Sequence, residues 1–406
     1  MDPLDVGLIG LTWAPIPSSG LREVLGKWIG RGELFDGLAF PDEDGLSSWS
    51  AADVEARAHR ILLERLKPLV ARLPTRADEW NDVLPAVRLQ KAAVSLAPTS
   101  GTSWPATRIR FGWPPTEFVG RQAVRNADSL LATALKWTFG KLAEVRSSAI
   151  EAYPDADAAI RKQIDAGYRA ASRPPLVSVP PIRPGRHDLV AIRRAGTPWG
   201  LVSEIADELA LLDAPPHVLA TELLAPDDGI RWRLFHLGVL GEILQAARGL
   251  GCAVRSYGPL RPGGGRPSFE LQDVQGGTLD LWFEGAGIWQ AAGLRSPYSE
   301  ATSGIALKER VLGADLLLSR PNGPFLIIEC KYSSNPDFVA RNGYYQAVTY
   351  AAELASRTGA KVTSIAVGPE GIAGRGGFVD LNVGQVGICP PSAIPEVLRE
   401  FLSRTA

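Results

Sequence analysis

An acidic and a basic side chain end one of the most apolar runs of the sequence, residues 325–331 (FLIIECK). Successive side chains of a β-strand alternate between two faces, so Glu329 and Lys331 would share one face with Ile327. Burying a carboxylate and an ammonium group at the end of such a run costs free energy unless an ion pair or a metal ion offsets it. These residues are therefore the first candidates for chemistry in this chain.

A second carboxylate, Asp315, stands 14 residues before Glu329 and opens the apolar run ADLLLS. The intervening residues 319–324 (SRPNGP) are typical of a turn, so the spacing predicts a β-hairpin with both carboxylates at the same end of neighbouring strands. Oxygen ligands in that position suit Mg²⁺, which binds one or two carboxylates and keeps several waters. Lys331 would then lie beside a metal-bound water. There it could orient that water as a nucleophile or stabilise the charge that develops on a phosphate during a reaction.

The residues that surround this hairpin alternate between helical and strand patterns. They predict an α/β domain over residues 230–406, with a mixed central sheet flanked by helices. The expected helices lie at 231–251 and 335–359, and the expected strands lie at 252–259, 268–274, 276–285, 314–320, 325–333 and 361–369.

The residues before this domain are predicted to form a largely helical N-terminal region. Apolar residues recur with a helical period in several segments. Residues 97–116 are rich in proline, glycine, serine and threonine, which predicts a connector around a short strand. The expected helices are 20–30, 50–72, 77–95, 118–152 and 155–171.

Five prolines between residues 174 and 184 indicate an extended linker or a domain edge, because proline interrupts helices and central strands. We therefore expect a helical region at 1–96, a helical and linker region at 97–229 with a proline-rich edge at 172–187, and the α/β domain at 230–406.

Composition narrows the classes of function. The 406 residues carry a formal net charge of −1, so any contact with nucleic acid needs a local basic patch or a bound cation. The three cysteines form no CxxC pair, and neither a signal peptide nor a membrane span is recognisable, which favours a cytoplasmic protein. The histidines show no HxH or HExxH spacing, and no GxxxxGK[ST] loop occurs, so neither zinc catalysis nor NTP hydrolysis is expected.

The acidic and basic residues of the hairpin match a known pattern. Asp315, Glu329 and Lys331, arranged as D-x(n)-E-x-K across two strands, resemble the PD-(D/E)xK nuclease superfamily, which has the restriction-endonuclease-like fold; Ala314 stands where many members have proline. The resemblance implies Mg²⁺- or Mn²⁺-dependent hydrolysis of phosphodiester bonds. It also implies that the backbone carbonyl of Cys330 helps the two carboxylates to hold the ion.

Two further features extend the resemblance. Gln346 and Tyr350 are four residues apart on the helix that follows and resemble the QxxxY motif of the RecB-like nucleases, which implies support for the lysine or the substrate backbone. Glu242, on the helix before the sheet, stands where the family often has an acidic residue that completes the metal site. A solvated surface glutamate is the alternative for Glu242, and a simple polar–aromatic pair is the alternative for Gln346 and Tyr350.

The segments LFHLGVLGEILQAARGLG, GADLLL, IIECKY and GYYQAVTYA are also similar to the nuclease subunit of McrBC-type restriction systems. In those proteins the nuclease domain is C-terminal and the N-terminal part engages a nucleotide-driven motor. The superfamily resemblance covers about residues 230–370, and no motif of the N-terminal half is carried over from the McrBC-type proteins. The similarity to the McrBC-type subunit implies DNA as the favoured substrate, a setting in bacterial restriction or phage defence, and an NTPase motor or another defence-system subunit as a candidate partner.

Two alternatives to a self-sufficient nuclease remain: a non-catalytic nucleic-acid-binding or scaffold subunit with a nuclease-like fold, and a nuclease subunit that is inactive without an NTP-driven partner. Arg261 and Arg266 flank a glycine-rich turn and are candidate phosphate contacts, although such turns are more often only mobile. Trp104 and Trp113, in the polar connector, are candidates for base stacking or partner binding.

Overall fold

The computed structural model divides the chain into two compact units, Met1–Glu55 with Ala214–Ala406, and Ala56–Asp213. The boundaries of these two units differ from those of the three expected ranges. The helices at Ser18–Lys27 and Arg31–Leu38 pack with the C-terminal part and therefore belong to its unit. The residues described are 14–40, 49–84, 87–126, 129–261, 265–305, 313–320, 323–374 and 377–404.

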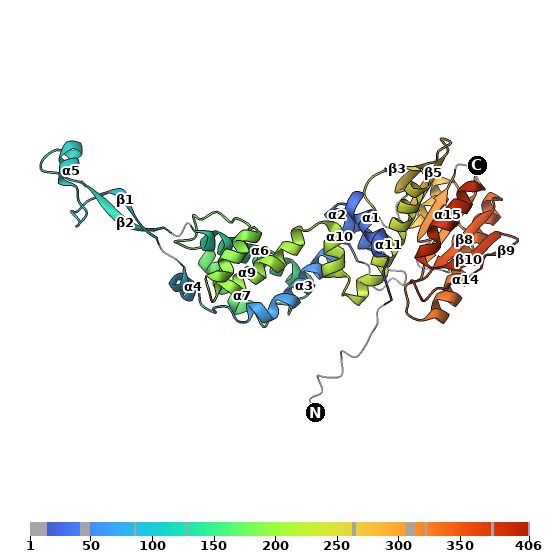
Figure 1. Cartoon of the computed structure of the whole chain (residues 1–406), viewed down its shortest axis with the longest axis horizontal. Coiled ribbons are helices and arrows are strands. Elements are labelled where there is room, and N and C mark those ends of the chain that lie inside the picture. Colours follow the sequence, from blue (N-terminus) through green and yellow to red (C-terminus); the bar gives the residue numbers. More distant parts are fainter. Residues whose placement is uncertain are drawn as a thin grey trace, which may run out of the picture. The chain divides into compact units, whose positions relative to one another are not determined.

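The unit that contains the C-terminal part is built on an eight-stranded mixed sheet with the strand order β3-β4-β5-β6-β7-β8-β10-β9. Figure 1 shows strands of this sheet, among them β3, β5 and β8. The pairs β7–β8 and β8–β10 are parallel and the other pairs are antiparallel. This confirms the expected α/β fold with a mixed sheet flanked by helices. The strands are β3 (Ala253–Ser256), β4 (Phe269–Gln272), β5 (Thr278–Phe283), β6 (Leu316–Ser319), β7 (Phe325–Cys330), β8 (Val362–Val367), β9 (Val379–Leu381) and β10 (Gly384–Cys389).

One face of the sheet is covered by the long helix α14. Its residues Ala347 and Leu354 pack against Phe325 and Ile327 of β7 in one buried cluster. The expected helix at 335–359 is confirmed because both ends are capped: the Asn335 side chain accepts hydrogen bonds from two backbone amides of the first turn, and Gly359 ends the helix in a left-handed conformation. The helices of this unit are α1 (Ser18–Lys27), α2 (Arg31–Leu38), α10 (Pro216–Val218), α11 (Asp228–Gly249), α12 (Ile288–Ala291), α13 (Pro297–Ala301), α14 (Pro336–Thr358) and α15 (Ile394–Ser403).

Helix α11 packs against β7, α15 and the N-terminal helix α1. Its contact with α1 is unusually close. A Cβ atom on Gly241 would lie 1.8 Å from the carbonyl oxygen of Gly20, and a Cβ atom on Gly20 would lie 1.9 Å from the carbonyl oxygen of Gly238. Only glycine allows the two backbones to approach in this way, so these positions fix where α11 lies on the unit.

Gly241→Ala should therefore destabilise this unit by about 1–3 kcal/mol, the usual cost of inserting a methyl group into a packed interface. Gly249 ends the same helix, and a Cβ atom there would meet no neighbouring atom within 4 Å. Gly249→Ala is thus a matched control that should leave the free energy of unfolding nearly unchanged. Thermal or urea unfolding of the two variants tests the contact, and equal stabilities would contradict it.

The second unit, Ala56–Asp213, is mainly helical. This confirms the expectation that the region before the α/β domain is largely helical. Its core includes the fully buried Trp80, whose ring meets Phe139 at 5.2 Å and Trp199 at 6.2 Å, both edge-on. In neither unit does any described helix have the length and apolar character that crossing a bilayer requires. The helices are α3 (Ala51–Val70, which begins in the first unit), α4 (Ala77–Val83), α5 (Trp104–Phe111), α6 (Leu130–Ala152), α7 (Arg161–Ala171), α8 (Arg186–Arg194) and α9 (Trp199–Leu209).

Three expectations for residues 77–152 are wrong in part. The helix at 77–95 ends at Val83, and the helix at 118–152 begins only at Leu130, because Val87–Ser95 (β1) and Phe118–Asn126 (β2) pair as a nine-residue antiparallel ribbon. The expected short strand in the connector is instead the helix α5, which packs on β2 (Figure 1). Cross-strand pairing thus outweighs the local helical pattern.

Candidate metal centre

The hairpin β6–β7 brings Asp315 and Glu329 together as expected. The register pairs Leu316 with Ile328, so Asp315 precedes β6 at the edge of the sheet where β7 ends. The Asp315 backbone N–H donates to Glu329 Oε2 at 3.3 Å, and the Cys330 backbone N–H donates to Asp315 Oδ2 at 2.7 Å. The expected turn residues Pro321 and Asn322 lie outside the described residues.

Lys331 completes this group as the sequence predicts. Its Nζ atom lies 2.7 Å from Glu329 Oε1, and both side chains are largely buried. Burial alone would lower the pKa of Lys331, but Glu329 and Asp315 raise it, so the ammonium group stays charged. Gly343 of α14 lies against the lysine stem, since a Cβ atom there would meet Lys331 Cγ at 3.4 Å.

The acidic groups are poorly solvated. Glu329 is 3% exposed, and burial together with the charge of Asp315 raises the pKa of Glu329 to about 8. Burial also raises the pKa of Asp315, although Lys331 opposes that shift. One lysine offsets only part of the cost of charging these two carboxyl groups, so a divalent cation would stabilise their ionised forms.

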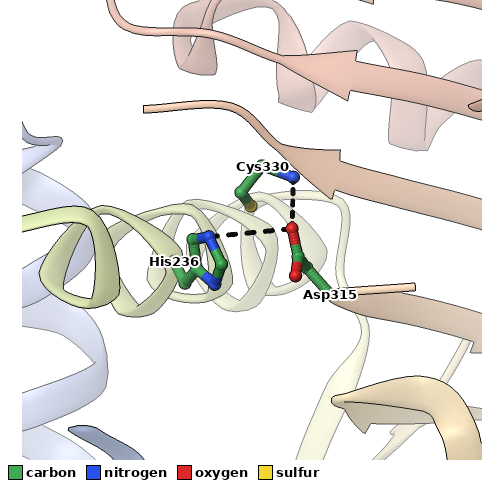
Figure 2. A group of neighbouring side chains, drawn as sticks. All are labelled: His236, Asp315 and Cys330. Carbon is green, nitrogen blue, oxygen red and sulfur yellow. Dashed lines mark hydrogen bonds and ion pairs between the residues drawn. The ribbon is translucent and has the colours of Figure 1, made fainter. Parts of the chain in front are cut away.

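A histidine outside the predicted set of site residues lies beside these carboxylates. His236, on α11, places Nε2 at 3.6 Å from Asp315 Oδ2, and one potential ligand atom each from His236, Asp315 and Cys330 lie within 4.8 Å of one another (Figure 2). Burial and the nearby Arg233 lower the pKa of His236 to about 3, so the imidazole is neutral. Its buried Nδ1 has no hydrogen-bond partner among the described residues. A neutral imidazole next to carboxylates is a suitable ligand for a divalent metal ion.

Figure 2 shows the side chains of His236 and Cys330 directed toward Asp315 from α11 and from the end of β7. Burial and the neighbouring carboxylates raise the pKa of the Cys330 thiol well above its usual value, so this sulfur stays protonated and is a weak ligand. The grouped atoms that could bind a divalent ion are therefore an Asp315 carboxylate oxygen and a His236 nitrogen, and the neighbouring Glu329 carboxylate adds the oxygen ligand that Mg²⁺ or Mn²⁺ prefers. The backbone carbonyl of Cys330 as a further ligand remains a prediction.

A third acidic residue also approaches the group from the neighbouring strand. Glu284 directly follows β5, and its backbone N–H donates to the Asp315 carbonyl oxygen at 2.8 Å. Its carboxylate forms an ion pair with Arg233 of α11. The sequence does contain a signal for Glu284, because it ends the buried strand LDLWF in the same way as Glu329 ends FLII.

The structure does not bring Glu242 to this group. The Glu242 carboxylate accepts hydrogen bonds from the Gly20 backbone N–H at 2.9 Å and from the Ser19 hydroxyl, so its described contacts are with the first turn of α1. It lines a separate cavity of about 320 Å³ with Ser392 and Glu370. The side chain that α11 directs toward Asp315 is His236, almost two turns before Glu242.

Gln346 and Tyr350 lie on α14, as expected. Both are half-buried; Tyr350 packs beside the central cluster and lines a small void with Gly313 and Ala314, next to Asp315. Gln346 is three residues after Gly343, which contacts Lys331, so it shares that side of the helix. Their supporting roles remain predictions.

The expected phosphate contacts and stacking residues lie at the surface. Arg261 and Arg266 are exposed, and residues 262–264 between them lie outside the described part. Trp104 and Trp113 are exposed at the end of the β1–β2 ribbon, with ring centroids 6.4 Å apart.

The raised pKa of Glu329 predicts how the stability of the metal-free protein depends on pH. A carboxyl group whose pKa is higher in the folded than in the unfolded state stabilises the fold most below pH 4.5 and loses that contribution as pH rises through about 8. The melting temperature in EDTA should therefore fall between pH 6 and pH 8. Glu329→Gln, which cannot ionise, should flatten the decline; an equal decline in both proteins would contradict the assignment.

Comparisons with known proteins supply no family for this chain. It matches no protein-family model and no curated protein. Among solved structures, one match is a chain from an assembly of Thermococcus gammatolerans, described as a refined half-complex of McrB AAA+ hexamers with bound McrC. The identity is 11% and the TM-score is 0.26, over 96% of this chain and 77% of the other. A TM-score of this size establishes neither a shared fold nor a shared activity.

Proposed function

We propose that this chain is a divalent-metal-dependent nuclease that hydrolyses phosphodiester bonds, with DNA as the favoured substrate and bacterial restriction or phage defence as its setting. One observation carries the proposal: Asp315 and Glu329 lie in contact at one edge of the sheet, with the Lys331 ammonium group 2.7 Å from Glu329. The PD-(D/E)xK resemblance of the same three residues supports the choice of reaction. Mg²⁺ or Mn²⁺ fits the oxygen-rich donor set.

A bound cation would supply positive charge at the phosphate and lower the pKa of an attacking water. The chain's own residues would do the rest. Asp315 and Glu329 would hold the cation, and neutral His236 would complete the donor set without adding charge. Lys331 would orient the water and donate a hydrogen bond to a phosphate oxygen as charge develops there. The water oxygen would bond to phosphorus as the ester P–O bond breaks; the water would release a proton to solvent, and the departing oxygen would take up a proton.

The test is a cleavage assay on four substrates: supercoiled plasmid, linear duplex, single-stranded DNA and RNA, each with Mg²⁺, Mn²⁺ or EDTA. The proposal predicts cleavage that requires the cation and favours DNA. Cleavage that persists in EDTA would contradict the metal requirement. A protein that binds no Mn²⁺ and cleaves nothing would support the non-catalytic scaffold instead.

A second candidate function, a nuclease subunit that needs an NTP-driven partner, is favoured by the surface of the β1–β2 ribbon. Large apolar side chains gather near its end: Leu96 is 83% exposed, Ile109 is 88% exposed and Trp113 is 72% exposed. Clustered exposed apolar side chains, tryptophan above all, are characteristic of protein–protein contact sites. Mn²⁺ binding without cleavage by the isolated chain would favour this candidate.

A further inference from the structure

The backbone at Glu284 is strained. Its φ of 58° makes it the one described residue other than glycine with a positive φ. A left-handed conformation at a residue with a long side chain costs free energy and persists only where the surroundings impose it. Here the hydrogen bond from Glu284 N–H to the Asp315 carbonyl and a second from Gly285 N–H to the Ala314 carbonyl, at 2.7 Å, hold the turn. These two hydrogen bonds hold the turn beside Asp315, and the Glu284 side chain there forms an ion pair with Arg233.

The partner of Glu284 is fixed far more firmly than Glu284 itself. Arg233 is 3% exposed, and its guanidinium carbon lies 4.6 Å from the ring centre of Trp232 and 5.5 Å from that of Phe40. Its buried Nε has no hydrogen-bond partner among the described residues. Arg233 is therefore held between aromatic rings as a fixed cation. The Glu284 carboxylate is 19% exposed and ends a flexible side chain, so it is the member of the pair that can move.

We propose that Glu284 is a third carboxylate ligand of the metal centre and that Arg233 is its counter-ion when no cation is bound. The inference rests on the proposed function, because it assumes the cation that Asp315, Glu329 and His236 fit. It explains why a strained turn carries a carboxylate to this edge although Glu242, the acid expected there, contacts α1 instead. A purely structural role would explain why Glu284 pairs with Arg233. It would not explain the strained backbone at Glu284, because a buried ion pair contributes too little net stability to offset that strain.

The test measures Mn²⁺ binding by isothermal titration calorimetry, with electron paramagnetic resonance as a check on free Mn²⁺. Glu284→Gln keeps the shape of the side chain and removes its charge, so it should raise the Mn²⁺ dissociation constant by at least about 10- to 100-fold, because losing even a group that only supports a metal ligand has that effect. Arg233→Met removes the competing cation and should lower the dissociation constant. Glu353→Gln changes another largely buried glutamate, whose carboxylate accepts a hydrogen bond from the Ser296 hydroxyl. This substitution should leave the Mn²⁺ dissociation constant unchanged.

The Mn²⁺ dissociation constant should rise in Glu284→Gln and fall in Arg233→Met, and these opposite changes distinguish a metal ligand from a purely structural ion pair. A purely structural ion pair would make Glu284→Gln and Arg233→Met lower the melting temperature alike and leave the Mn²⁺ dissociation constant unchanged, and that result would overturn the inference. If Arg233→Met does not fold, Arg233→Lys, which keeps the charge but loses the planar stacking, should leave Mn²⁺ affinity near that of the wild type. A wild-type chain that binds no Mn²⁺ would overturn the proposed function together with this inference.

Discussion

Glu329→Gln should lower the rate of cation-dependent cleavage by about 100- to 1,000-fold, because the reaction would lose a ligand carboxylate and the partner of Lys331. Glu329 and Lys331 are in contact at 2.7 Å, so the substitution also leaves the ammonium group less constrained. The measurement is the initial rate of DNA cleavage at saturating Mg²⁺ or Mn²⁺. We expect the metal-free variant to be at least as stable as the wild type at pH 8, since a charge is removed from a buried acidic group.

Glu353→Gln is the matched control for this prediction. Glu353 is also a largely buried glutamate of the same unit, but it accepts a hydrogen bond from Ser296 and lies outside the metal centre. Its substitution should leave the cleavage rate unchanged. If Glu329→Gln cleaves as fast as Glu353→Gln, the reaction occurs elsewhere in the chain.

Trp80→Ala should destabilise the helical unit by about 3–5 kcal/mol, the usual cost of removing a fully buried aromatic side chain. Trp80 packs edge-on against Phe139 and Trp199, all in the unit Ala56–Asp213. Because the candidate metal centre belongs to the other unit, the Mn²⁺ dissociation constant should not change. Thermal unfolding and calorimetry measure the two quantities on the same protein.

Trp104→Ala, at a tryptophan that is 49% exposed, is the control and should cost far less stability. If Trp80→Ala abolished Mn²⁺ binding, the two units would depend on each other for folding. The cleavage rate of Trp80→Ala then decides between a nuclease that is complete in one unit and one that requires the whole chain.

The paired carboxylates could be predicted from sequence because the interactions that place them are local. Alternation within FLIIECK sets the face of Glu329, and the turn-forming residue types at 319–324 predict a hairpin, whose observed register pairs Leu316 with Ile328 and so places Asp315 beside Glu329. The caps of α14 are local in the same way, since Asn335 and Gly359 act within one turn of the helix ends.

The rest of the site depends on contacts between distant segments, which short-range patterns do not reveal. Whether α11 offers His236 or Glu242 to the centre is decided by how the helix lies on the unit, and the glycine contact with α1 fixes that. Glu284 comes from a strained turn that a pattern search does not distinguish from any strand end. The β1–β2 ribbon is not predicted for a related reason. The apolar spacing of each strand continues that of the neighbouring helix, and only pairing with the distant strand makes it extended.

The most direct test of the central claim compares single-turnover cleavage by the wild type and Lys331→Ala, with Mn²⁺ binding measured in parallel. Lys361→Ala, which changes an exposed lysine just before β8, is the matched control. The account predicts that Lys331→Ala still binds Mn²⁺ but cleaves at least about 100-fold more slowly, while Lys361→Ala cleaves like the wild type. Cleavage at the wild-type rate by Lys331→Ala would contradict the assignment of this site as the active centre.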